Sequence, residues 1–144
     1  GRIQKAYYGD EKNRIYAVTD QISLTQEDIR EVQMAKGAIA AGIELMMEEL
    51  EITYEQVDRV ILCGAFGTYM NAKSAARIGL IPEPLLSKVI AGGNAAGMGC
   101  RQITMDQKLF ALTGELVQKI EPLDLASRPQ FQRTFAKQMA FSEV

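Results

Sequence analysis

The spacing of hydrophobic residues predicts a short strand and then a long helix in the first third of the chain. Residues 13–18 alternate as in a strand, and the polar turn at 9–13 suggests that residues 6–8 form the other half of a hairpin. Further on, apolar residues recur at steps of three and four, as on one face of a helix. They are Ile29, Val32, Ala35, Ile39, Ile43, Met46, Met47 and Leu50. We expect a helix over about 26–50, capped by Thr25, with this stripe buried.

Small residues inside this helix indicate that another part of the backbone comes close to it. Gly37 and Gly42 each cost about 1 kcal/mol in a helix interior, so a packing reason is expected. With the neighbouring alanines they leave room for close contact. We expect that contact to be with a sheet.

The middle of the chain predicts two further strands, each followed by a helix. A β-branched, mostly apolar run at 57–63 is typical of a strand buried on both faces, and 88–91 is a second short strand. The capping box at 53–56 begins a helical turn, Asn71 can cap a helix over 72–78, and another helix follows from Ala95 to about Ile103.

The C-terminal third is expected to hold one more regular helix and a less regular tail. Residues 104–107 form a capping-box pattern, after which Leu109, Leu112, Leu116 and Ile120 predict a buried helical side. From Pro122 onward the pattern weakens. The order of strands and helices predicts a three-layer α/β arrangement in a single domain over residues 1–144.

Composition excludes several classes of function. The 144 residues are 47% hydrophobic and 24% charged, with a net charge of −2, so a core can form and nucleic acid is not an expected partner. No apolar run reaches the roughly 18–20 residues that span a bilayer. The absence of His excludes His-dependent triads within these residues. Cys63 and Cys100 form no C-x-x-C pair; we expect both to be small buried hydrophobes in a reducing cytoplasm.

Two strand–glycine–helix junctions are the candidate binding site. One consists of Gly64, Ala65, Phe66 and Gly67, and the other of Gly92, Gly93 and Asn94. Glycine lets a backbone approach a ligand, and ligands of open α/β sheets bind beyond the carboxyl ends of the strands. Each junction alone also suits a plain turn, but two in succession favour a nucleotide cleft. Neither a P-loop nor a G-x-G-x-x-G pattern occurs.

The carboxylates do not suggest catalysis. Glu27, Asp28 and Glu31 gather at the expected start of the long helix, where they favour the helix dipole. We predict no catalytic residue and no metal site in these residues.

Five segments resemble a known family in the same order. They are residues 24–39 (LTQEDIREVQMAKGAI), 64–69 (GAFGTY), 78–82 (IGLIP), 93–96 (GNAA) and 129–131 (PQF). Together they are similar to the C-terminal region of the reductive activators of corrinoid proteins, from about residue 22 to residue 141. These relatives are ATP-dependent iron–sulfur proteins that return cobalt(II) corrinoid to cobalt(I) for methyl transfer.

The resemblance implies an actin-like, sugar-kinase-like ATPase fold, of which this chain is most of the second lobe and the C-terminal part of a longer protein. It implies that the two glycine junctions border the adenosine of ATP, and that Gln33 and Lys36 on the long helix lie beside the adenine. ATP with Mg and a two-iron two-sulfur cluster would belong to the longer protein, the cluster lying outside this chain. No Asp-x-Gly phosphate loop occurs here, so these residues alone are not expected to hydrolyse ATP.

The implied partners are a corrinoid protein and the remaining ATPase lobe of the same protein, with a homodimer left open, in the cytoplasm and away from membranes and nucleic acid. Two alternatives remain. The lobe keeps the fold for protein interaction or regulation without nucleotide, or the longer protein activates another low-potential redox protein.

Overall fold

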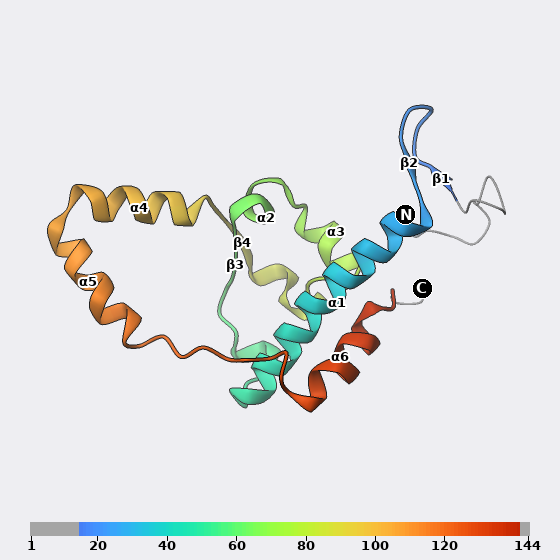
Figure 1. Ribbon diagram of the computed structural model, residues 1–144. Helices are drawn as coiled ribbons and strands as arrows, with labels where there is room; N and C mark the ends of the chain where they lie inside the picture. Colours follow the sequence, from blue (N-terminus) through green and yellow to red (C-terminus); the bar gives the residue numbers. More distant parts are fainter. Residues whose placement is uncertain (1–14, 142–144) are drawn as a thin grey trace.

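The computed structural model describes residues 15–141 and shows a mixed chain of helices and strands (Figure 1). The strands are β1 (Tyr16–Ala17), β2 (Ser23–Leu24), β3 (Val60–Cys63) and β4 (Val89–Gly93). The α-helices are α1 (Gln26–Glu49), α2 (Gly64–Tyr69), α3 (Ala72–Arg77), α4 (Ala95–Met105), α5 (Gln107–Val117) and α6 (Pro129–Met139), and the 3₁₀ helices are η2 (Tyr54–Gln56) and η3 (Glu83–Lys88). The α/β class predicted from the sequence is confirmed.

Strands β3 and β4 form a parallel pair, which is the centre of the structure. Ile61 pairs with Ile90 and Cys63 pairs with Gly93, with a shift in register after Leu62. The crossover between the strands runs through α2, α3 and η3. Both strands were predicted, but the burial predicted for residues 57–63 on both faces was wrong, since Ile61 is 57% exposed. Its register partner Ile90 is 43% exposed.

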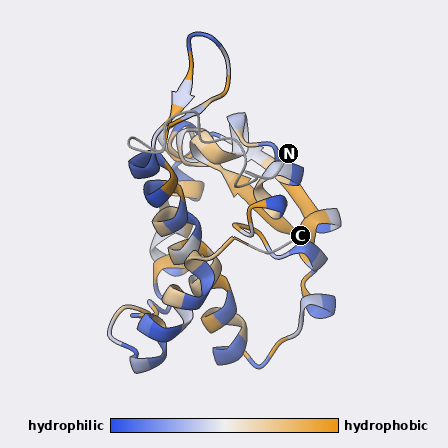
Figure 2. Ribbon diagram, turned by 90° about the vertical axis from the view of Figure 1, so that its right-hand side faces the viewer, coloured by the Kyte–Doolittle hydropathy of each residue, from blue (hydrophilic) through white to orange (hydrophobic). Residues whose placement is uncertain are grey.

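The core lies on the other face of this pair. Its buried members are Ala75, Leu80, Ile81 and Leu85. Partly buried side chains that pack against them come from both strands, from α1 and from the crossover: Ile39, Ile43, Tyr54, Val57, Val60, Leu62, Met70, Ile78 and Val89. Figure 2 shows hydrophobic and hydrophilic stretches alternating along the helices, as expected for amphipathic helices with one buried side.

Strand β1 does not join this parallel pair. It pairs antiparallel with β2, a strand that sequence reasoning missed, and the turn between them is closed by a hydrogen bond from Val18 N to Ile22 O of 2.8 Å. The hairpin partner predicted at residues 6–8 lies outside the described residues.

Helix α1 begins where the sequence predicts. The Thr25 hydroxyl accepts a hydrogen bond from Asp28 N at 3.1 Å, and Thr25 N donates to Asp28 Oδ2 at 2.7 Å. The bond from Thr25 N to the charged carboxylate, together with one that the Thr25 hydroxyl donates to the same oxygen, lowers the pKa of Asp28. The capping-box pattern at 53–56 likewise begins η2, with Thr53 N donating to Gln56 Oε1 at 2.8 Å.

The predicted buried stripe of α1 is partly wrong. Ile39 and Ile43 reach the core, but Val32, Met46 and Leu50 are exposed. The buried residues of α1 form a neighbouring line of small side chains and one lysine: Lys36, Gly37, Ala40, Ala41, Gly42 and Leu45.

That line packs against α6, a helix that the sequence pattern did not predict (Figure 1). A Cβ on Gly37 would lie 2.9 Å from Met139 Cγ and 3.3 Å from Met139 Cα. The predicted close approach is therefore real, but its partner is a helix rather than a sheet. Phe131 and Phe135 stack on α6 with ring centroids 5.9 Å apart.

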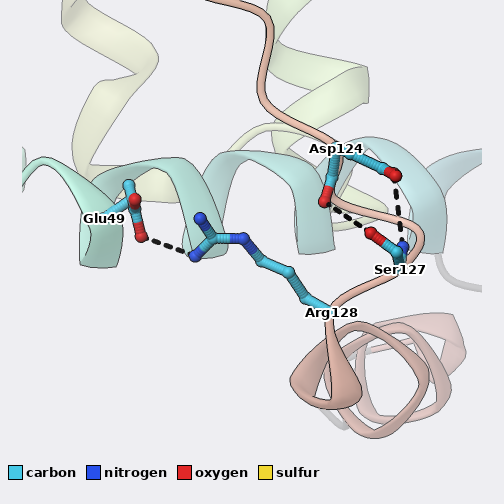
Figure 3. A network of polar contacts seen from close by, with 4 residues as sticks. All are labelled: Glu49, Asp124, Ser127 and Arg128. Carbon is cyan, nitrogen blue, oxygen red and sulfur yellow. Dashed lines mark hydrogen bonds and ion pairs between the residues drawn. The ribbon is translucent and has the colours of Figure 1, made fainter.

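Polar contacts fix the segment that leads into α6 to the end of α1 (Figure 3). Arg128 Nη1 lies 2.5 Å from Glu49 Oε2, and Ser127 N donates to Asp124 Oδ1 at 3.3 Å. The hydrogen bond from Arg128 lowers the pKa of Glu49. The connection thus returns to α1 at a defined place.

Helices α4 and α5 leave the parallel pair and lie to one side of the structure (Figure 1). The helix predicted from Ala95 is confirmed and extends to Met105. The next helix is capped by Asp106, whose Oδ1 accepts from Lys108 N at 2.8 Å; the predicted cap Thr104 instead donates to Cys100 O.

Two predictions of burial are wrong, one for the apolar residues of α5 and one for the two cysteines. Leu109, Leu112, Leu116 and Ile120 are exposed rather than buried. Cys63 and Cys100 are free and exposed, not small core residues. Within the described part of the chain, no helix is both long and apolar enough to cross a membrane.

Candidate functional site

The two glycine junctions meet at the carboxyl end of the parallel pair. Cys63 and Gly93 are register partners, so the residues that follow β3 and those that end β4 lie at the same edge. A Cβ on Gly67 would lie only 3.1 Å from Gly93 N. The two junctions therefore converge at this edge, which is where ligands of open α/β sheets bind.

Gly67 makes the tightest contact of the site. A Cβ at this position would lie 2.0 Å from Leu62 O and 2.7 Å from Leu62 C. Both atoms belong to the backbone of β3, so no side-chain movement can relieve the overlap. Only glycine lets α2 fold back on the strand from which it leaves.

Gly64 and Gly93 serve a different purpose. Their φ angles are +69° and +56°, the left-handed region that favours glycine, and a Cβ on either would meet no heavy atom within 4 Å. The space over both Cα atoms is thus open. Open space over two glycines at one sheet edge leaves the backbone accessible to a ligand.

Each glycine junction leads directly into the start of a helix, α2 at the first junction and α4 at the second. Gly64, Ala65, Phe66 and Gly67 were predicted as a turn, but they are the first residues of α2, and Ala65 and Phe66 are exposed. Thr68 Oγ1 donates to Gly64 O at 3.1 Å. Sequence reasoning missed this contact, although a Thr four residues after a glycine in a helix is the signal that could have found it.

The second junction is organised by Asn94. Its Oδ1 accepts from Gly97 N at 3.0 Å and so caps α4, which begins directly after β4. Gly92 packs tightly, since a Cβ there would lie 2.8 Å from Cys63 Sγ and 2.8 Å from Ile61 Cγ2. The three predicted residues of this junction therefore have separate roles: close packing at Gly92, an open face at Gly93 and a helix cap at Asn94.

Lys36 lies elsewhere, in the interface between α1 and α6. Its side chain is 2% exposed, and its Nζ donates to Ala140 O at 2.6 Å and lies 5.5 Å from the centre of the Phe141 ring. Burial lowers the pKa of Lys36. The ammonium thus holds the end of α6 rather than facing the glycine junctions. Gln33, the other predicted residue of this helix, is half-buried one turn earlier.

Among residues 15–141 no group of three or more His, Cys, Asp or Glu side chains lies close enough together to hold a metal ion.

Comparisons with known proteins agree on one family. The model of the C-terminal domain of RACo, the ASKHA domain, matches residues 3–144. The corrinoid activation enzyme RamQ of Eubacterium limosum is 30% identical over 122 residues, covering 85% of this chain and 21% of RamQ. The [Co(II) methylated amine-specific corrinoid protein] reductase of Methanosarcina barkeri is 26% identical over 122 residues, covering 83% of this chain and 22% of the reductase.

A solved structure agrees with these relatives. It is a reductive activator for corrinoid, iron-sulfur protein, with a TM-score of 0.77 and 33% identity, covering 83% of this chain and 19% of that protein. The chain therefore spans about a fifth of the length of the relatives that it matches.

Proposed function

The chain belongs to the family of the C-terminal ASKHA domain of RACo, and from this premise we propose that it provides the adenosine side of an ATP site in a corrinoid activator. The observation that carries the proposal is the convergence of the two glycine junctions at the carboxyl end of β3 and β4. It is supported by the open space over Gly64 and Gly93, where an adenosine has room to lie against backbone.

The proposed site is half of a complete one. Adenosine gains affinity mainly from apolar contact, whereas a triphosphate needs hydrogen-bond donors and a metal ion. The sequence has no Asp-x-Gly phosphate loop, and the described residues hold no metal-binding cluster. We therefore assign the phosphates and Mg to the remaining lobe of the longer protein. On this proposal the 144 residues alone do not hydrolyse ATP.

The longer protein is proposed to reduce cobalt(II) in a corrinoid protein to cobalt(I), the state used in methyl transfer. The names of the relatives support this, since they include a corrinoid activation enzyme and a Co(II) corrinoid protein reductase. The electron would come from a two-iron two-sulfur cluster outside these residues. We propose the cytoplasm as the compartment, where the exposed thiols of Cys63 and Cys100 stay reduced.

Calorimetric titration of ATP into the full-length protein tests the nucleotide site. We expect Gly64→Val to weaken binding at least about tenfold, because the valine side chain fills the open space and its β-branching disfavours a backbone φ of +69°. Gly99→Ala, in α4 where a Cβ meets no heavy atom within 4 Å, is the matched control and should bind ATP like the unaltered protein. Circular dichroism confirms that each variant is folded.

Gln33 and Lys36 stay candidates for the border of the adenine. Lys36 reaches a nucleotide only by leaving Ala140 O, so we expect Lys36→Ala to weaken ATP binding less than Gly64→Val does. Gln33→Ala tests the neighbouring position without disturbing that contact.

One alternative has a specific observation in its favour. The exposed apolar residues of α4 and α5 also suit a lobe that serves protein interaction and no longer binds nucleotide. Unchanged ATP binding by a folded full-length Gly64→Val variant would support this alternative. Tight ATP binding by the isolated 144 residues, where we expect millimolar affinity or none, would instead contradict the half-site argument. Activation of another low-potential redox protein is distinguished by assaying reduction of a corrinoid protein directly.

A further inference from the structure

The outer face of the parallel pair lacks the cover that parallel sheets have. Ile61 and Ile90, which are register partners, are both exposed there, and so is Cys63. Parallel strands occur almost only in sheets with both faces covered, and a two-stranded sheet is marginally stable in water. Within the described residues neither β3 nor β4 has a further neighbouring strand. This face needs a partner.

Helix α5 presents a second uncovered apolar surface. Its large apolar side chains fall on one broad side of the helix and are 37–65% exposed: Leu109, Phe110, Leu112, Leu116 and Val117. The opposite side carries Lys108, Ala111 and Glu115. A helix with one charged side and one apolar side is built to bury the apolar side, yet α5 packs in the described structure mainly against α4.

We propose that these two surfaces, the outer face of β3–β4 and the apolar side of α5, are covered within one molecule by the part of the longer protein outside these 144 residues. Length supports this occupant, since each matched relative has about four fifths of its chain outside the aligned segment. The chemistry supports it too: an apolar side of α5 without charges resembles the interior of a permanent interface more than the polar surface of a transient one. The inference does not depend on whether the glycine junctions bind a nucleotide.

Alkylation of Cys63 in the unaltered full-length protein, located by peptide mass spectrometry, tests the cover of the sheet face. The thiol is exposed in the 144 residues, so without a cover it would react about as fast as in urea-unfolded protein. With the proposed cover we expect native Cys63 to react at least about 100-fold more slowly, because it must wait for local opening. Equal rates in native and unfolded protein would overturn the proposal.

A pair of substitutions tests the cover of α5. Leu116→Glu places a carboxylate on the apolar side, and Ala111→Glu places the same group on the charged side as the matched control. In the full-length protein we expect proteolysis between α4 and α5 to be at least about tenfold faster for Leu116→Glu only, because a buried carboxylate without a partner favours the open form. Equal proteolysis of both variants would overturn the proposal.

If another molecule covers these surfaces, the alkylation experiment gives a different result, and each such result would overturn the proposal. A second copy predicts that protection of Cys63 is lost on dilution, together with a change from dimer to monomer in light scattering. A corrinoid protein predicts that Cys63 is protected only after that protein is added.

Discussion

Substitution of Gly67 by alanine is the sharpest test of the structure at the sheet edge. The added Cβ would lie 2.0 Å from Leu62 O, whereas non-bonded heavy atoms prefer a separation of roughly 3.5 Å. The backbones of β3 and α2 must therefore separate by more than about 1 Å. Relief of this kind costs about 3 kcal/mol, and the better helix propensity of alanine returns about 1 kcal/mol, which leaves a net loss of about 2 kcal/mol.

The assay is thermal unfolding of the 144-residue chain, followed by circular dichroism at a helical wavelength. For a chain of this size a loss of about 2 kcal/mol lowers the melting temperature by roughly 8 °C. Gly99→Ala is the matched control, since its Cβ meets no heavy atom within 4 Å, and it should raise stability by up to about 1 kcal/mol. If Gly67→Ala melts at or above the temperature of the unaltered chain, the close approach of α2 to β3 does not exist, and the tight packing assigned to Gly67 at the sheet edge is wrong.

Three further predictions concern the interface between α1 and α6. Gly37→Leu should lower the free energy of unfolding in urea by about 2–3 kcal/mol, because α6 must move away, while Gly42→Ala, whose Cβ meets its nearest atom at an ordinary 3.6 Å, should not lower it. Burial lowers the pKa of Lys36 below 10.5 in the folded chain, so between the folded and unfolded pKa values the unfolded chain binds more protons and the contribution of Lys36 to stability rises with pH. The free energy of unfolding of the unaltered chain relative to Lys36→Met should therefore increase as the pH approaches 10.5. A difference that does not depend on pH would refute burial as the cause of the lowered pKa. Arg128→Met removes an exposed ion pair with Glu49, so the melting temperature should hardly change, and 1 M salt should abolish what change there is; a large, salt-independent loss would show that Arg128 acts through packing.

Local chemistry is what the sequence predicts well. Thr25 caps α1, and Asn71 caps α3 through a bond from Ser74 N of 3.0 Å, because a side-chain oxygen at a helix start finds its donor within three residues. Strands β3 and β4 were found from their apolar runs. The two glycine junctions were found because positive φ and close packing leave few alternatives to glycine, and parallel strands place their carboxyl ends together.

Burial is what the sequence could not decide. The periodic stripe of α1 predicted one buried face, but the side that is buried is the one that meets α6, which arrives from the far end of the chain. Lys36 is buried there because the end of α6 offers the Ala140 carbonyl to its ammonium, a contact that no local pattern contains. Helix α6 itself was missed for a related reason, because its residues pack against the small residues of α1, a contact that the local pattern of the tail does not contain.

The apolar sides of β3–β4 and α5 show the same limit from the other direction. Residues 57–63 and the leucines of α5 were predicted as buried, because an apolar pattern indicates a surface that favours burial, whichever part of the protein provides its partner. Ile61 and Leu116 nonetheless stay exposed in the 144 residues, because hydrophobic burial depends on which surfaces the three-dimensional arrangement brings together. The sequence by itself determined which residues are apolar enough to favour burial, and the tertiary structure alone decided which of them are buried within this chain.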